Sequence, residues 1–544
     1  MSWADRLLLA LLGLALFLPG IGARDVWNPD EPRYAVVARE MRESGDWLVP
    51  HVNGRLYSEK PPLHFWAIAA ASYLTGGVTE TAARLPAAAA ATLTLFLLWG
   101  IGRRLFDREV AWGAVLVFAT SSKILWQGRV GQIDMTLIAL VTLAMYAFVR
   151  GFVEERDGFF RLFFVAAGLA TLAKGPVGLL PPLLAIVAFA LATGQRDLLR
   201  RMRIPTGLAI WALVVLAWLG PAILSAGREY FEIIVLKQNV TRYADPWHHF
   251  QPWYYYLTVV PADFFPWSLF VPGSIWVLWR RSTGGERRGY QWAFAWMAVT
   301  LVFFSLSPAK RTVYILTMYP ALALLVAAGF AEIRKSWPRM RGWLVAPAAL
   351  TALLLTLLPL LGFVAVRYYP ERIAKPLAEL RPLGPGLLPT LLALGLALSA
   401  AGLAALLAAR RGATGTVVGA LALGMGVAGV AASLWVLPRF DAVKSARPLS
   451  AKVLELARPD EPYAIWPRFD APFVFYTHRN AVEVQGEAEL RAFVARPAKV
   501  WLLAEKEALA RLDPPLPLVE VARDEERREG YVLLTRPGGA APAP

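Results

Sequence analysis

The sequence predicts an α-helical polytopic membrane protein, and three observations support this. The chain has 544 residues, of which 57% are hydrophobic and only 18% are charged, whereas soluble proteins carry about 25% charged residues. The apolar residues form uninterrupted blocks of about 20, the helix length that crosses ~30 Å of hydrocarbon. Arginines separate these blocks. Together these features exclude a single globular cytosolic enzyme and a disordered chain.

About thirteen transmembrane helices are expected. They lie near residues 5–22, 83–102, 109–126, 134–153, 161–173, 176–194, 206–225, 262–279, 291–306, 312–330, 343–365, 386–409 and 415–437. The fifth and ninth blocks are short. The first has the length of a cleavable signal peptide, but we expect a retained span because many more spans follow it.

The charges between the blocks predict the side of the membrane on which each loop lies. With a cytoplasmic N-terminus every short cytoplasmic loop is rich in Arg or Lys, as the positive-inside rule requires. The clusters are Arg103, Arg104 and Arg108; Arg150, Arg156 and Arg161; Arg196, Arg200, Arg201 and Arg203; Arg280, Arg281, Arg287 and Arg288; Arg334, Lys335, Arg339 and Arg341; and Arg410 and Arg411. We therefore assign the net charge of +16 to topology and membrane lipids, and expect no nucleic acid partner.

Three polar segments fall on the outer side, which is the periplasm in a Gram-negative bacterium. Residues 23–81 form a first outer loop, residues 226–261 a second, and residues 438–544 a C-terminal domain. Residues 1–437 then form the transmembrane catalytic domain. The chain has no cysteine, so it can hold neither a disulfide, a Cys-ligated zinc nor a thiol nucleophile.

The first outer loop is expected to contain two helices that lie in the membrane interface. Residues 30–41 begin with acidic residues, carry Pro32 in the first turn and place apolar residues at helical spacing. Residues 63–73 are rich in Trp, Phe and Ala. Both segments are typical of interfacial helices with a polar edge facing water.

The C-terminal segment alternates short apolar runs with helical stretches, which indicates a small α/β domain. The apolar runs are Tyr463–Trp466, Phe473–Tyr476, Val500–Leu503 and Tyr531–Leu534, and the helical stretches are Glu487–Val494 and Glu505–Leu512.

The chemistry is expected in the first outer loop, where charged residues are packed around prolines. Residues 27–34 read Trp-Asn-Pro-Asp-Glu-Pro-Arg-Tyr, and residues 57–62 read Tyr-Ser-Glu-Lys-Pro-Pro. Proline fixes φ and holds its neighbours on stiff turns. Paired carboxylates can act as a general base or bind a metal, and the cations can clamp a phosphate. A polar loop held by ordinary salt bridges is the alternative.

Four motifs resemble, in this order, those of a known family. They are Asp30-Glu31-Pro32-Arg33-Tyr34, residues 57–62, Arg84-Leu85-Pro86 and Leu172-Ala173-Lys174-Gly175-Pro176. The family is the membrane glycosyltransferases of the protein O-mannosyltransferase type. The chain more closely resembles the lipid A transferases for 4-amino-4-deoxy-L-arabinose, which use an undecaprenyl-phosphate-linked sugar.

The resemblance implies a glycosyltransferase C fold and a pentosyltransferase of the bacterial inner membrane. It would move aminoarabinose to lipid A phosphates by inverting displacement, and this change to lipopolysaccharide would give resistance to polymyxin and cationic peptides. Two other functions stay open. One is the same chemistry on protein Ser/Thr or another glycan. The other is a lipid or sugar transporter, although a transporter places its ionisable residues at mid-membrane.

The same resemblance implies that Asp30 is catalytic, either as a base or as a positioning group. The leaving phosphate needs cations for its developing charge. The residues expected to bind substrate are Arg33, Tyr34, Tyr57, Glu59, Lys60, Lys174 and Arg242.

Further candidates lie at the outer ends of the spans. Asp134 is a lone acid at such a position, where ionisable groups are functional or paired; we expect a catalytic role, with pairing to Arg129 as the alternative. Lys310, Arg311 and Tyr314 lie in an outer loop where cations oppose the charge bias, so we expect them to bind phosphate.

A metal site is an open alternative. Glu59, His248 and His249 could hold a divalent ion such as zinc, although adjacent histidines rarely face one ion; interfacial histidines in an aromatic loop are the other interpretation. We expect that no cofactor is required and that the protein is a monomer.

Overall fold

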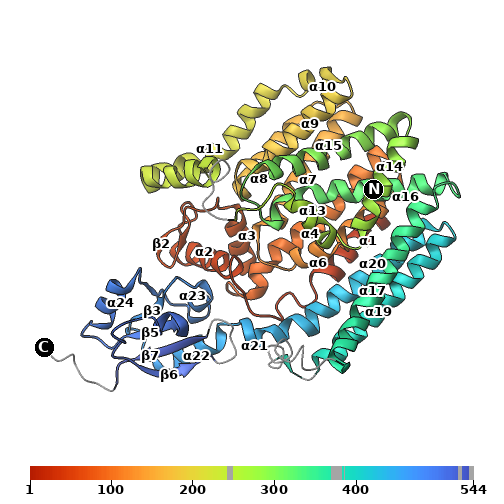
Figure 1. Ribbon diagram of the computed structural model, residues 1–544. Coiled ribbons are helices and arrows are strands. Elements are labelled where there is room, and N and C mark those ends of the chain that lie inside the picture. Colours follow the sequence, from red (N-terminus) through yellow and green to blue (C-terminus); the bar gives the residue numbers. More distant parts are fainter. Residues whose placement is uncertain (242–248, 369–382, 385, 525–529, 538–544) are drawn as a thin grey trace.

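The structure is a computed structural model that describes residues 1–241, 249–368, 383–384, 386–524 and 530–537. Arg242 and His248, both expected at the site, lie outside the described residues. A large bundle of helices stands beside a small sheet near the C-terminus (Figure 1).

The helical part runs from the N-terminus to residue 444. Its elements are α1 (Trp3–Phe17), α2 (Glu31–Ser44), β1 (His51–Val52), β2 (Arg55–Leu56), α3 (Leu63–Ser72), α4 (Glu80–Leu105), α5 (Arg108–Ala119), α6 (Ser122–Gln127), α7 (Ile133–Val153), α8 (Gly158–Lys174), η1 (Pro176–Gly178), α9 (Leu180–Ala192), α10 (Arg196–Arg201), α11 (Ile204–Phe231), η2 (Glu232–Thr241), α13 (Tyr255–Asp263), η3 (Trp267–Phe270), α14 (Val271–Arg281), α15 (Gly284–Leu306), η4 (Thr312–Met318), α16 (Tyr319–Lys335), α17 (Gly342–Tyr368), α19 (Leu387–Arg410), α20 (Thr414–Ala431), η6 (Ala432–Val436), η7 (Leu437–Phe440) and α21 (Asp441–Lys444).

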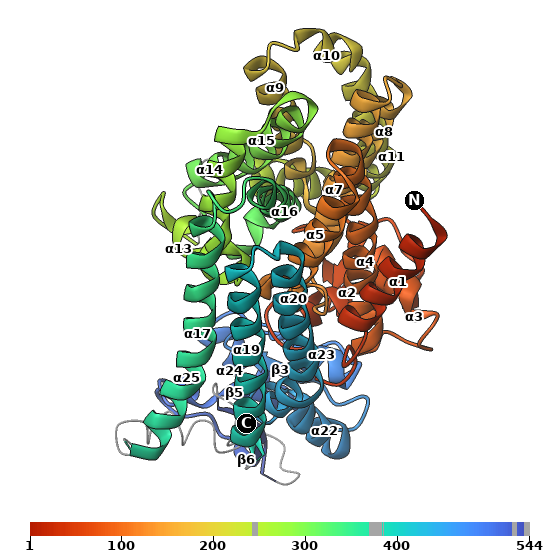
Figure 2. The ribbon, with the colours of Figure 1, turned by 90° about the vertical axis from the view of Figure 1, so that its right-hand side faces the viewer.

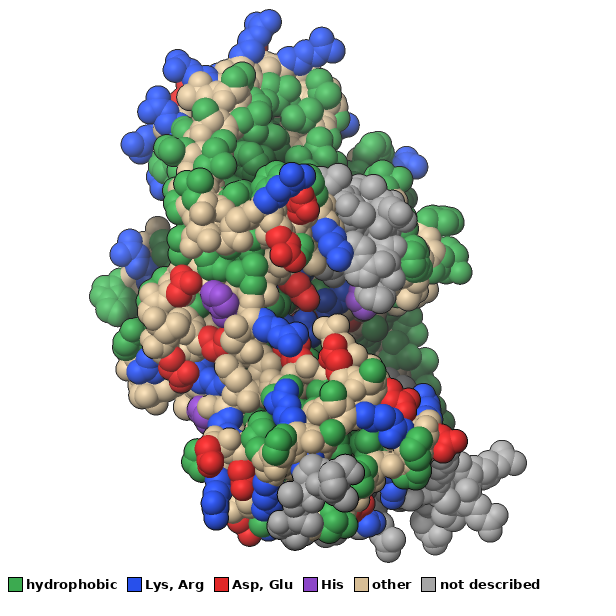
Figure 3. Space-filling model, turned by 90° about the vertical axis from the view of Figure 1, so that its left-hand side faces the viewer, with side chains coloured by type: hydrophobic (Ala, Val, Ile, Leu, Met, Phe, Trp, Pro, Cys, Tyr) green, Lys and Arg blue, Asp and Glu red, His purple; other side chains and the backbone are tan. Residues whose placement is uncertain are grey.

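Eight helices within the described residues are long and apolar enough to cross a membrane. They are Glu80–Leu105, Ile133–Val153, Ile204–Gln238, Gly284–Leu306, Thr312–Lys335, Gly342–Leu361, Leu387–Arg410 and Thr414–Lys444. One face of the molecule shows an apolar upper half with Lys and Arg at its top and mixed charges in the lower half (Figure 3). The chain is a multi-pass membrane protein; the count of thirteen spans stays a prediction.

Several expected spans are shorter or broken. The first helix ends at Phe17 instead of residue 22. The block at 109–126 forms two helices, α5 and α6, and the block at 262–279 is interrupted between α13 and α14. Pro266 lies in that interruption, where its missing N–H prevents a continuous helix.

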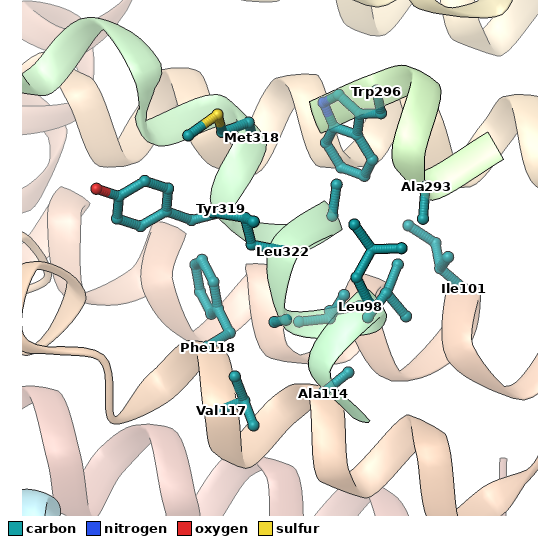
Figure 4. Close-up of a cluster of buried hydrophobic side chains, with 14 of the residues drawn as sticks. Leu98, Ile101, Ala114, Val117, Phe118, Ala293, Trp296, Met318, Tyr319 and Leu322 are labelled. Atoms are coloured by element: carbon teal, nitrogen blue, oxygen red, sulfur yellow. The ribbon is translucent and has the colours of Figure 1, made fainter. Parts of the chain in front are cut away.

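The core of the bundle surrounds α16. Figure 4 shows Leu98 and Ile101 of α4, Phe118 of α5 and Trp296 of α15 packed around Leu322 of α16. All of these side chains are buried. In Figure 2, α17, α19 and α20 run side by side toward the C-terminal sheet.

The two expected interfacial helices are confirmed as α2 and α3. Pro32 lies in the first turn of α2, and the helix ends at Gly45, whose φ of 74° is the left-handed conformation that favours glycine. Both helices lie between the bundle and the C-terminal sheet (Figure 1). There Val36 of α2 and Phe65 of α3 share a buried cluster with Phe473 and Tyr531 of the C-terminal part.

The C-terminal part contains a five-stranded sheet of order β4-β3-β5-β7-β6. Its elements are α22 (Arg447–Leu456), β3 (Tyr463–Trp466), α23 (Ala471–Thr477), β4 (Val482–Glu483), α24 (Glu487–Val494), β5 (Trp501–Glu505), α25 (Lys506–Leu509), β6 (Val519–Arg523) and β7 (Tyr531–Thr535). Strand β3 pairs in parallel with β4 and β5, while β7 is antiparallel to β5 and β6.

The apolar run Phe473–Tyr476 was expected as a strand, and this is wrong. It lies in helix α23, which carries Pro472 in its first turn. A run of four apolar residues fits a buried helix face as well as a buried strand, so periodicity could not separate the two.

Candidate functional site

A cavity of about 420 Å³ lies where the first outer loop meets the bundle. Its polar lining contains Asp30, Tyr34, Lys60, Asp134, Lys174, Gln238, Arg311 and Tyr314. Its apolar lining includes Leu137, Val177, Leu180, Phe303 and Phe304. Seven of the residues expected from the sequence therefore line one cavity, although they come from segments up to 284 residues apart.

Asp30 directly precedes the first residue of α2 and is held from two other segments. Its Oδ2 accepts hydrogen bonds from Arg311 NH2 at 3.1 Å and from Gln132 Nε2 at 3.2 Å. Arg311 precedes η4, and Gln132 precedes α7. The carboxylate is thus fixed at the cavity beside a guanidinium group.

Asp134 and Lys174 form an ion pair at the same cavity. Asp134 lies in the first turn of α7 and Lys174 in the last turn of α8, so each charge opposes the partial charge of its helix end. Lys174 Nζ also lies 5.1 Å from the centre of the Tyr314 ring. The alternative pairing of Asp134 with Arg129 is wrong, because Arg129 donates to the carbonyl oxygens of Leu125 and Gly429.

Glu31, next to Asp30, is buried and accepts hydrogen bonds from three segments. Its carboxylate accepts from Arg84 at 2.7 and 2.9 Å, from Arg24 at 2.9 Å and from the Gly131 backbone N–H at 2.8 Å. Burial alone would raise the pKa of Glu31, but the charges of Arg84 and Arg24 and the hydrogen bonds lower it to about 2.

This arrangement connects the two acids of the cavity. Gly131 is followed by Gln132, which donates to Asp30, and three residues later the chain reaches Asp134. Glu31 therefore fixes the segment that carries Asp134 against the segment that carries Asp30. The sequence motif contained Glu31, but nothing in the sequence indicated its two arginine partners or the role of Gln132.

The remaining first-loop candidates lie at or beside the cavity. Lys60 lines it, and its Nζ donates to the Glu59 carbonyl oxygen at 2.9 Å. Arg33 and Glu59 form a partly exposed ion pair at 3.3 Å and are not part of the lining. Tyr57 is buried next to them, and burial raises the pKa of its hydroxyl.

Lys310 and His249 do not line the cavity. Lys310 Nζ donates to the carbonyl oxygens of Ser307 at 2.6 Å and Gln251 at 3.0 Å, and the Lys310 backbone N–H donates to the carbonyl oxygen of His249. These bonds join the segment before α13 to the segment before η4.

The described ranges contain no group of three or more His, Asp or Glu side chains placed to hold a metal ion. The carboxylate of Glu59 is paired with Arg33. The described side chains therefore do not form a ligand set, and we route no chemical step through a metal.

The chemical character of the cavity follows from its lining. Lys60, Lys174 and Arg311 supply three positive charges, and Asp30 and Asp134 supply two negative charges. Such a site favours an anionic group held near a carboxylate. The phenylalanine and leucine side chains of the opposite wall suit an apolar chain attached to that group.

Comparisons with known proteins agree with the motifs. Residues 59–220 match the family described as dolichyl-phosphate-mannose-protein mannosyltransferase. The chain is 31% identical over 342 residues to undecaprenyl phosphate-alpha-4-amino-4-deoxy-L-arabinose arabinosyl transferase of Aeromonas hydrophila, a match that covers 61% of this chain and 60% of that protein. The protein of the same name from Pectobacterium carotovorum is 30% identical over 354 residues, 62% of each chain. The chain thus matches about three fifths of the length of these relatives, and the predicted resemblance is confirmed.

The crystal structure of ArnT from Cupriavidus metallidurans bound to undecaprenyl phosphate has the same fold. It matches with a TM-score of 0.79 and 22% identity, covering 100% of both chains. The expected glycosyltransferase C fold is therefore confirmed.

Proposed function

We propose that this protein transfers 4-amino-4-deoxy-L-arabinose from undecaprenyl phosphate to phosphate groups of lipid A. The observation that carries the proposal is the cavity, where Asp30 and three cations face an apolar wall. A polyprenyl-phosphate sugar combines the same two properties, an anionic head and an apolar tail. The names of the relatives that match over three fifths of their length supply the sugar, and the lipid A acceptor follows from the resemblance noted above.

In the proposed reaction the cations bind the phosphate of the donor. Lys60, Lys174 and Arg311 neutralise the charge that develops on the leaving phosphate. Phe303 and Phe304 contact the first isoprene units. No strong acid is needed, because a phosphate is already a good leaving group.

The bond changes are those of a direct displacement. A phosphate oxygen of lipid A attacks the anomeric carbon, the bond from that carbon to the undecaprenyl phosphate oxygen breaks, and its electron pair stays on the leaving phosphate. The configuration at the anomeric carbon inverts. The second pKa of a phosphate monoester is about 6, so the acceptor is mostly ionised at neutral pH. Asp30 takes up the proton that remains on the minor protonated form and orients the acceptor.

The other site residues have supporting roles in this proposal. Asp134 orients the Lys174 ammonium group, and Tyr34 and Tyr314 border the sugar. Arg33, Tyr57 and Glu59 shape the first loop beside the cavity. Arg242, which the sequence places in the second outer loop, adds a cation for phosphate.

The cellular setting is part of the same proposal. Residues 1–437 form the transmembrane catalytic domain and residues 438–544 a periplasmic domain, with the cavity at the periplasmic face of the inner membrane. The protein acts as a monomer and requires no cofactor. Its product raises resistance to polymyxin.

Expression in a bacterium that makes the donor but lacks its own lipid A aminoarabinose transferase tests the proposal. We expect the lipid A mass to increase by the sugar and polymyxin resistance to return. Asp30→Asn should abolish both. Asp46→Asn is the matched control, because Asp46 lies in the same outer loop and accepts backbone hydrogen bonds from Leu48 and Val49 away from the cavity. Unmodified lipid A in cells that contain the donor and the folded protein would refute the proposal, and transfer to protein Ser/Thr would point to the alternative acceptor.

A further inference from the structure

Four consecutive residues before the catalytic loop are bonded to the C-terminal part of the chain. They are Asp25, Val26, Trp27 and Asn28. We call them the entry segment, because Asp30 and helix α2 follow it directly.

Three side chains of the C-terminal part accept these hydrogen bonds. Asp441 accepts from the backbone N–H of Asp25 at 3.0 Å and from the indole Nε1 of Trp27 at 2.7 Å. The hydroxyl of Tyr476 accepts from the backbone N–H of Val26 at 2.8 Å. In α23 and the residue before it, Asp470 joins Tyr476 by accepting from the Asn28 side chain at 2.5 Å.

The opposite side of the entry segment is held by the bundle. Arg84 of α4 donates to the carbonyl oxygens of Arg24 and Asp25, both at 2.8 Å. The carbonyl oxygens of the segment therefore face the bundle, while its N–H groups and the Trp27 and Asn28 side chains face the C-terminal part. The path of the chain into Asp30 is fixed only when both sides are in place.

We propose that Asp441 and Tyr476 are positioning residues for the transfer reaction, and that the C-terminal part acts in catalysis by holding the entry segment. This inference rests on the proposed function. Neither residue lines the cavity, so each acts through the backbone that leads to Asp30. Displacing a reacting group by about 1 Å can lower a rate by about a hundredfold.

The cations of the cavity are held independently of this contact. Lys174 is paired with Asp134, and Arg311 precedes η4. Loosening the entry segment should therefore lower kcat while leaving KM for the donor lipid unchanged. A general loss of folded protein would instead lower the active fraction without changing the kcat of the molecules that stay folded.

Tyr476→Phe and Tyr463→Phe form a matched pair of variants. Each removes one phenolic hydroxyl with two hydrogen bonds from the C-terminal part. The Tyr476 hydroxyl bonds Val26 and Glu80, whereas the Tyr463 hydroxyl bonds Thr477 and Arg479 within the C-terminal part. Only the first variant touches the entry segment.

The experiment measures kcat and KM for the donor with the purified full-length protein, together with hydrogen exchange of peptides that cover residues 24–30. We expect Tyr476→Phe to lower kcat about tenfold at constant KM and to speed exchange of the Val26 amide. Tyr463→Phe should leave both unchanged in the folded fraction. Equal kcat and equal exchange for the two variants would overturn the proposal.

A series at Asp441 provides a second test if Tyr476→Phe does not fold. Asp441→Ala removes both acceptors, whereas Asp441→Asn keeps one. We expect kcat to fall in the order wild type, Asn, Ala, with KM constant; equal kcat in all three would contradict the inference. Absence of any transfer by the wild type would sink the proposed function, while the exchange measurement would still decide whether the C-terminal part orders the entry segment.

Discussion

Replacing Glu31 by glutamine removes the charge that neutralises two buried arginines. The side chains of Glu31, Arg24 and Arg84 are 2%, 5% and 0% exposed, and their charged atoms lie 2.7 to 2.9 Å apart. In the variant one oxygen can still accept, but an amide NH2 group faces a guanidinium donor. Removing one partner from a buried ion pair costs about 3–5 kcal/mol because the remaining charge is left uncompensated. We expect a loss of this size in the free energy of unfolding.

The assay is unfolding of the purified protein by heat or denaturant in one detergent, with Glu59→Gln as the control. Glu59 and its partner Arg33 are 47% and 31% exposed, and exposed pairs contribute about 0–1 kcal/mol. Adding Arg84→Met to Glu31→Gln should recover part of the loss, because the double variant leaves fewer unpaired charges. A loss below about 1 kcal/mol for Glu31→Gln, equal to that of the control, would refute the assignment of Glu31 as the ionised centre of this cluster.

Three further outcomes follow from the same contacts. The pKa of Glu31 is lowered from 4.5 to about 2 in the folded protein, so its contribution of about 3 kcal/mol is complete above pH 4.5 and is lost as the pH falls toward 2; unfolding measured between pH 3 and 6 should show this loss for the wild type, and an equal slope for Glu31→Gln would contradict it. Arg311→Lys keeps the charge but loses the planar group that donates to Asp30, and we expect kcat to fall at least tenfold with the donor still bound, which a full kcat would disprove. Lys174→Met should weaken donor binding, read as an increased KM, and should also leave Asp134 buried without its partner; an unchanged KM would exclude Lys174 from the phosphate site.

The sequence was sufficient for features that depend on local patterns. Proline in the first turn and helical spacing of apolar residues predicted α2 and α3. Hydropathy predicted the long spans, and the motifs predicted that the acids and cations of the first loop belong to a site. These signals act within one or two helical turns, so they do not require the rest of the fold.

Contacts between distant segments could not be predicted in this way. Asp30 meets Arg311 across 281 residues, and Glu31 meets Arg84 across 53; composition does not say which cation faces which acid. The sequence likewise missed β6, whose residues are mostly exposed. For the same reason Arg129 was a reasonable but incorrect partner for Asp134.

The most direct test of the central claim is transfer by the purified protein reconstituted with donor lipid and lipid A, followed by mass spectrometry of the lipid A. We predict aminoarabinose on its phosphate groups for the wild type and for Asp46→Asn, and none for Asp30→Asn. Unchanged lipid A from the wild type, or full transfer by Asp30→Asn, would contradict the claim.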